Sequence, residues 1–141
     1  MRKFKHPWLN DSEYPVLQVT FPQGYSYEQT EAMFNDVQSF YAQNSAPFAW
    51  VVDATRVSVA DAKARKLTAE HEARSKEHLR RFNAGTAFVI ESAWVRGIVT
   101  AIYWISPPAY PYEVFADVAY ARAWARERVS SRVGTSSARS A

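Results

Sequence analysis

Apolar and polar residues follow two different periods along this chain, and these periods predict alternating strands and helices. Short runs that are apolar throughout, at 48–52 and 86–90, predict strands buried on both faces. Between them, apolar residues recur every three or four positions, which is the spacing of one helix face. In chain order, we expect strands 4–9 and 15–21, helix 27–43, strand 48–52, helix 59–82, strand 86–90, helix 93–105, strand 113–115 and helix 118–128.

Residues that favour helix starts support these boundaries. Gln29 follows Ser26 by three residues, which is the spacing of a capping box, and Asp61 follows Ser58 in the same way. The segment 83–85, Asn-Ala-Gly, is expected to end the second helix. The four helix caps are expected at Ser26, Ser58, Ser92 and Asp117.

Strands that alternate with helices indicate an α/β domain, because parallel strands need a crossover element between them. The first two strands have no helix between them and therefore predict one antiparallel edge. We expect a single domain over residues 1–129, with a mostly parallel mixed sheet of four or five strands and about four helices. Residues 130–141, rich in Ser and Arg, are expected to form a disordered basic tail.

Composition narrows the class of protein. With 141 residues, of which 48% are apolar and none is cysteine, the chain can form a core without disulfides and suits a reducing compartment. No run approaches the ~20 apolar residues of a membrane span, so we expect a cytoplasmic protein without an integral membrane segment. The net charge of +3 is small for a nucleic-acid binder, and no nucleic-acid partner is expected.

The loop after strand 48–52 is the first candidate for function, because partners and ligands often meet α/β domains at the carboxyl ends of strands. Asp53 has three interpretations there: a catalytic carboxylate, an acceptor for backbone N–H groups of the loop, or a partner of Arg56. No base or second acid stands at a motif spacing from it, so no catalytic residue is expected. His71 and His78 share a helix face but lie about 10 Å apart along the axis, too far to hold one metal ion, and no cofactor is expected.

The chain reads Val-Ser-Val-Ala-Asp-Ala-Lys-Ala at 57–64, and a short strand, an Asp cap and an Ala-Trp-Ala segment follow at 114–125. Over about residues 16–129, this pattern resembles the STAS family, the anti-sigma-factor-antagonist domains, and the SpoIIAA-like proteins within it. In that family the second helix starts at Asp-Ser-Ser-Gly, where a partner kinase phosphorylates one serine. The resemblance implies a non-enzymatic regulatory domain that binds other proteins.

The chain departs from the family at the modified serines. Asp61 falls on the family's Asp, whereas Ala62 and Lys63 replace the two serines and Ala64 replaces the Gly. Lysine cannot accept a phosphoryl group as serine does, so the loop is expected to dock a partner without the usual phospho-switch. The expected contact residues are Asp53, Thr55, Arg56, Ser58, Asp61 and Lys63.

The predicted helix 93–105 is unusual because Arg96 is its single charge and apolar residues surround its axis. A helix on one sheet face should keep a polar outer side, which leaves three interpretations. It is buried under the tail or under the N-terminal segment around Trp8, it forms a homodimer or protein interface, or it covers a pocket for a lipid or other apolar ligand. The residues expected to carry these contacts are Trp94, Ile98, Ile102, Tyr103 and Trp104.

Together these patterns favour a non-enzymatic regulatory or scaffolding domain that binds proteins and pairs with itself. The alternative is a domain that binds a small molecule, either a lipid or a nucleotide, at the same strand ends and apolar helix.

Overall fold

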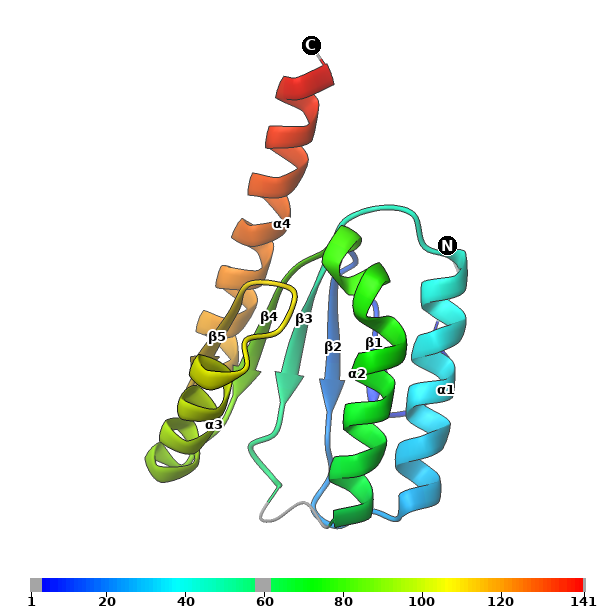
Figure 1. Cartoon of the computed structure of the whole chain (residues 1–141), viewed down its shortest axis with the longest axis vertical. Coiled ribbons are helices and arrows are strands. Elements are labelled where there is room, and N and C mark those ends of the chain that lie inside the picture. Colours follow the sequence, from blue (N-terminus) through cyan, green and yellow to red (C-terminus); the bar gives the residue numbers. More distant parts are fainter. Residues whose placement is uncertain (1–3, 58–61, 141) are drawn as a thin grey trace.

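The computed structural model describes residues 4–57 and 62–140, without the side chains of Ala62, Ile102 and residues 134–140. It is an α/β domain with a five-stranded sheet and four helices, as the sequence predicts (Figure 1). The strands are β1 (Leu9–Asn10), β2 (Val16–Thr20), β3 (Phe48–Asp53), β4 (Asn83–Val89) and β5 (Tyr112–Phe115), and the helices are α1 (Tyr27–Gln43), α2 (Ala62–Phe82), α3 (Ala93–Ile105) and α4 (Val118–Ser140).

The strands lie side by side in chain order, β1-β2-β3-β4-β5. β1 pairs antiparallel with β2, and every later pair is parallel, which confirms the predicted antiparallel edge. Ser26 caps α1 in a capping box with Gln29, also as predicted. Asp117 accepts the backbone N–H of Ala119 at 2.7 Å and so caps α4.

The helices divide between the two faces of the sheet. α1 and α2 cover one face, whereas α4 crosses the other (Figure 1). The central strand β3 alternates between them: Phe48 and Trp50 pack toward α1 and α2, and Ala49 and Val51 pack toward α4. This two-sided burial explains why the strand shows no polar alternation in the sequence.

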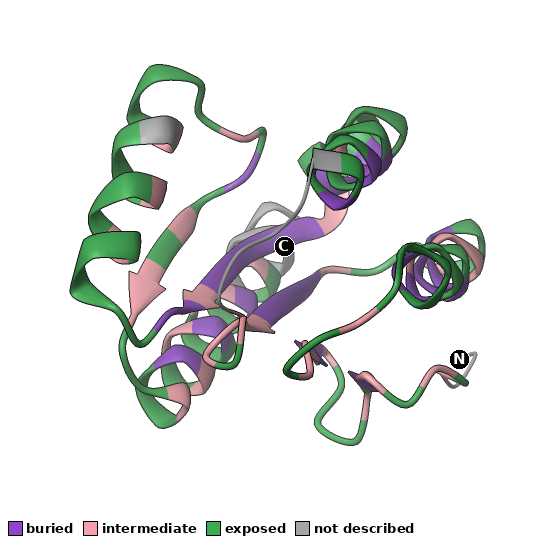
Figure 2. Cartoon of the chain, turned by 90° about the horizontal axis from the view of Figure 1, so that it is seen from below, coloured by how far each residue is buried: buried purple, intermediate pink, exposed green. Residues whose placement is uncertain are grey.

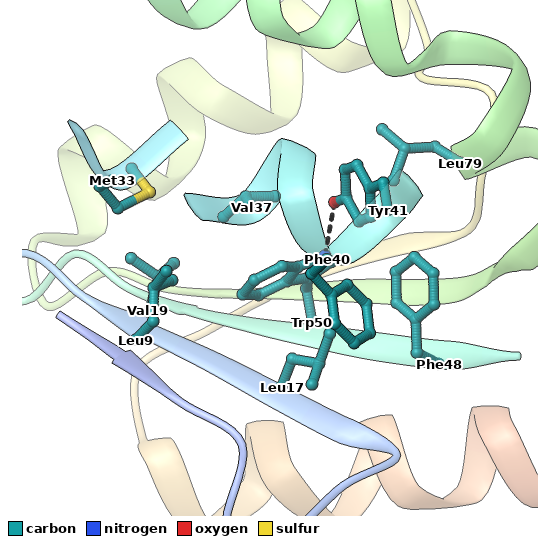
Figure 3. Packing of buried hydrophobic residues seen from close by; sticks show 10 residues of the cluster. All are labelled: Leu9, Leu17, Val19, Met33, Val37, Phe40, Tyr41, Phe48, Trp50 and Leu79. Atoms are coloured by element: carbon teal, nitrogen blue, oxygen red, sulfur yellow. Dashed lines mark hydrogen bonds between the residues drawn. The ribbon is translucent and has the colours of Figure 1, made fainter. Parts of the chain in front are cut away.

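Aromatic and large aliphatic side chains fill the core between the sheet and α1 (Figure 3). Phe40 and Phe48 are almost wholly buried, and their ring centroids are 5.8 Å apart in an edge-to-face arrangement. The Trp50 indole N–H donates to the Tyr41 hydroxyl at 2.8 Å, so the two polar groups in this cluster satisfy each other.

Small residues form the opposite core and let α4 approach the sheet closely. Ala87 of β4 and Ala121 and Ala125 of α4 have no exposed surface. The tightest approach is at Gly85, where an added Cβ atom would lie 2.7 Å from Cη2 of Trp124. A glycine inside a strand often marks such a close contact.

This contact changes the interpretation of residues 83–85. The second helix ends at Phe82 as predicted, but these residues begin β4 and do not form a helix cap. Asn83 directs its side chain back to the strand, where its amide donates to the Thr86 hydroxyl at 2.9 Å and its oxygen accepts the Gly85 N–H at 3.0 Å. Close packing against Trp124, rather than a left-handed helix cap, accounts for the glycine.

We predict that Gly85→Ala lowers the free energy of unfolding by about 1–3 kcal/mol, because the added methyl group overpacks the α4 contact. Trp124→Leu removes the ring that the methyl would meet. In the double variant the cost of Gly85→Ala should therefore shrink, giving a non-additive cycle in urea unfolding. Additive costs would show that the two side chains do not meet.

The secondary structure near both termini of the chain differs from the prediction. The first strand is only Leu9–Asn10, since the segment from Phe4 folds back instead and its Lys5 N–H donates to Asp36 of α1 at 2.7 Å. The structure also places helix where the sequence predicts a disordered tail from residue 130. Buried Val129 continues the apolar side of α4, and Arg132 donates to the carbonyl of Asn83, which holds this part of the helix on β4.

Candidate functional site

A cavity of about 140 Å³ lies over the face of the sheet that α1 and α2 cover. The sheet contributes its floor, α1 and α2 its walls, and α3 and the segment before β5 its far side. Apolar and aromatic side chains dominate the lining. The residues are Val19, Phe21, Met33, Phe34, Val37, Tyr41, Trp50, Val52, Thr68, His71, Glu72, Leu79, Asn83, Thr86, Phe88, Tyr103 and Tyr110.

A second hollow of about 240 Å³ adjoins this cavity between α2 and the connector before β5. Its wall includes Lys76 and the proline pair 107–108. The two spaces share four lining residues, Glu72, Leu79, Tyr103 and Tyr110. A molecule in the inner cavity can therefore extend toward this outer hollow.

Glu72 stands where the two spaces meet. The hydroxyl of Tyr110 donates to its carboxylate, at 3.2 Å from Oε1 and 3.3 Å from Oε2. Burial raises the pKa of Glu72, while the hydrogen bond from Tyr110 opposes that rise. Within residues 4–57 and 62–140, no lysine or arginine forms an ion pair with this carboxylate, so its partner is a neutral hydroxyl.

His71 forms a neutral wall of the cavity. Burial, assisted by the charge of Arg74, lowers its pKa to about 4. The side-chain amide of Gln38 donates to Nδ1 of the ring at 3.0 Å and to Ser75 at 2.7 Å. Since Nδ1 accepts, the neutral ring carries its proton on Nε2. Phe34 stacks on the same ring, with the centroids 4.2 Å apart.

The cavity tyrosines are also uncharged near neutral pH. Burial raises the pKa of Tyr41 and of Tyr110 well above the usual range, and raises that of Tyr103 to about 12. With His71 neutral, Glu72 is the one lining residue of the inner cavity that can carry a charge near neutral pH. The site is therefore an aromatic chamber with a single acidic group.

The predicted docking loop lies away from this cavity lining. Asp53 ends β3 and is half-buried, and its Oδ1 accepts the Thr55 N–H at 3.1 Å and the Thr55 hydroxyl at 2.7 Å. Of the three interpretations of Asp53, this geometry supports the acceptor for loop N–H groups. Arg56 is exposed. Ser58 and Asp61, with their predicted roles, lie outside the described residues.

Lys63 lies in a separate shallow hollow at the starts of α1 and α2. The hollow also contains Tyr27, Lys66, Leu67 and Glu70. The structure thus places Lys63 at the second residue of α2 rather than in the loop with Asp53.

α3 exposes most of its described apolar side chains, and Figure 2 draws most of this helix as exposed. Trp94 is 77% exposed and Trp104 is 85% exposed, and Ile98 and Ile105 are exposed as well. Neither the N-terminal segment nor α4 covers them within the described residues: Trp8 packs instead on Phe21 and Tyr25. Burial under the tail or the N-terminal segment is therefore excluded for the described chain.

A few specific contacts hold α3 to the domain. The Arg96 guanidinium donates to the carbonyls of Ile90 at 2.9 Å and Glu91 at 2.7 Å, where β4 ends. Tyr103 points inward, with its ring 5.5 Å from that of Phe88 and 4.9 Å from that of Tyr112. Tyr103 was expected at an apolar interface or pocket, and the structure places it in the cavity wall.

Sequence reasoning missed Glu72 and Tyr110 as site residues. They are separated by 38 positions in the chain, and the pairing depends on how the connector before β5 folds over α2. One available signal was the aromatic density around that connector, where Tyr103 of α3, Tyr110 and Tyr112 of β5 stand close together in the sequence.

No protein-family model, curated protein or solved structure matches this chain. In the part of the chain that the structure describes, no helix is both long and apolar enough to cross a membrane. The same residues contain no group of three or more His, Asp or Glu side chains placed to hold a metal ion.

Proposed function

We propose that this chain is a non-enzymatic protein-interaction domain that pairs with a second copy of itself through α3. The observation that carries the proposal is the exposure of large apolar side chains along one side of that helix. Aromatic and aliphatic residues of this size are enriched at interface centres. Single exposed apolar residues are common, whereas a row of them on one element marks a contact surface.

The exposed side chains form a regular stripe. Trp94, Ile98, Ala101 and Ile105 follow one another at intervals of four, three and four residues, which keeps them on one side of a helix and matches the seam of a helix pair. The stripe is about 16 Å long. In an antiparallel pair, Trp94 of one copy lies opposite Ile105 of the other.

The middle of the stripe favours close approach. Ala101 is exposed, and an added Cβ atom at Gly97 would meet no atom within 4 Å. Arg96, the one charged residue of α3, turns inward to the end of β4. Two copies can therefore bring these helices together without burying like charges, which supports self-pairing over a partner chosen by charge.

The STAS resemblance adds a second surface to the proposal. Asp53 and Thr55 hold the turn after β3 in one conformation, and Lys63 presents a positive charge on α2. A docking surface of this kind works constitutively, because Ala62 and Lys63 stand where the resembling domains carry serines. The pair formed through α3 would present two such surfaces to a regulatory partner.

Light scattering after size-exclusion chromatography tests the pairing. We expect the full chain to be a dimer at high micromolar concentration and the Ile98→Asp variant to be a monomer. In the antiparallel arrangement the two copies of residue 98 lie near the symmetry axis, so two carboxylates would repel one another there. Tyr120→Ala, which changes an equally outward aromatic residue on α4, should remain a dimer.

A charge-reversal experiment separates lost pairing from lost folding. Ile98→Lys should also be monomeric alone, and mixing it with Ile98→Asp should restore a dimer, since opposite charges then face each other. A monomeric full chain, or a dimer that persists in the Ile98→Asp variant, would contradict pairing through α3.

A further inference from the structure

We infer that the inner cavity is a binding site for a small organic cation of the alkylammonium class, such as a quaternary ammonium group. The cavity lies between the sheet, α1 and α2, so binding there does not depend on pairing through the outer side of α3.

The charge of the cavity is the first argument. Among its lining residues, Glu72 is the one that can be ionised near neutral pH, and the neutral Tyr110 hydroxyl donates a hydrogen bond to it. A carboxylate in a mostly apolar space is left without a counter-charge, so a cation is the ligand that it stabilises most. The inner lining includes no lysine or arginine, which disfavours the phosphates of a nucleotide.

Aromatic rings are the second argument. The negative face of an aromatic ring attracts an ammonium group, and several rings around one site form the cage that recognises quaternary ammonium ligands. Glu72 lies among such rings, because Tyr110 contacts it directly and Tyr103 lies across the shared space, beside Phe88. The aromatic lining residues are Phe21, Phe34, Tyr41, Trp50, Phe88, Tyr103 and Tyr110.

Size is the third argument. A volume of about 140 Å³ is close to that of a cavity of about 150 Å³ that accepts benzene. It therefore suits a compact head group rather than a whole lipid. The outer hollow, which shares Glu72 and Tyr103 with the inner cavity, leaves room for a short polar extension of the ligand.

Binding should weaken as the pH falls, because a bound cation favours the ionised form of Glu72 and protonation competes with it. The neighbouring groups do not add a competing charge near neutral pH: His71 has a depressed pKa, and Tyr41, Tyr103 and Tyr110 have raised pKa values. Lys76 lies in the outer hollow, and the charge of Arg74 acts on His71.

The test compares choline with 3,3-dimethylbutan-1-ol, a neutral molecule of the same shape, in calorimetric titrations of the full chain. We expect choline to bind on the order of tenfold more tightly than the alcohol, and more tightly at pH 8 than at pH 5. Choline has no titratable ammonium proton, so a pH effect must come from the protein. The indole N–H resonance of Trp50, a lining residue, should shift as the site fills.

Glu72→Gln keeps the shape of the side chain and removes its charge, so choline affinity should fall on the order of tenfold while the affinity for the alcohol stays constant. Glu70→Gln is the matched control, because Glu70 lies on the same helix but is exposed beside Lys66. Circular dichroism verifies that both variants fold. Equal binding of choline and the alcohol, choline binding unchanged in Glu72→Gln, or no choline binding at millimolar concentration would each overturn the inference.

Discussion

Replacing Phe40 with alanine should lower the free energy of unfolding by about 3–5 kcal/mol, which is the usual cost of removing a buried aromatic side chain. Phe40 is 1% exposed and lies where α1 meets the sheet (Figure 3). Its ring contacts those of Phe4, Tyr41 and Phe48, with centroid distances of 5.2, 5.9 and 5.8 Å. The N-terminal segment, the helix and the central strand all lose a contact at once.

Urea unfolding followed by circular dichroism measures this loss. Tyr120→Ala is the control, because that ring is 72% exposed on α4 and its removal should change stability by no more than about 0.5 kcal/mol. Phe40→Leu should fall between the two, since it keeps part of the buried volume. A cost below about 1 kcal/mol for Phe40→Ala would mean that α1 does not pack on the sheet as described.

The parts of the fold that were predictable are those set by local patterns. Ser26 with Gln29 identifies the start of α1, and the apolar run at 48–52 identifies the central strand, because both signals lie within a few residues. Gly85 was misinterpreted for the opposite reason. Its role depends on Trp124, nearly forty residues later, and a glycine after a helix reads equally well as a cap.

The candidate sites show the same division. The apolar character of α3 is a local feature that is visible in the sequence, but it left three interpretations of the helix open. Only the tertiary structure shows that Trp94 and Trp104 are uncovered and that Tyr103 turns inward. The cavity could not be predicted, because its lining comes from separate strands, three helices and the connector before β5.

Acid should destabilise this protein in the range where His71 gains a proton. Its pKa falls from 6.5 to about 4 in the folded state, because burial penalises the charged ring. Between these two values the unfolded chain binds more protons than the folded chain, so stability falls as the pH falls. A pKa unit corresponds to about 1.4 kcal/mol, so His71 alone should cost roughly 3 kcal/mol between pH 7 and pH 4. Above pH 6.5 the ring is mostly neutral in both the folded and the unfolded chain, so none of this stability is lost there.

Other groups modify this slope, and a variant isolates the part due to His71. His6 and His78 also have lowered pKa values and act in the same direction, whereas the raised pKa of Glu72 acts in the opposite direction. His71→Gln keeps an acceptor for the Gln38 amide but does not titrate, so its unfolding free energy should depend much less on pH between 7 and 5. His78→Gln, which changes a half-buried ring on the same helix, should keep most of the slope. If His71→Gln and the unmodified chain lose stability in parallel on acidification, His71 is not held neutral by the fold, and the inner cavity would then contain a second charge that competes with any bound cation.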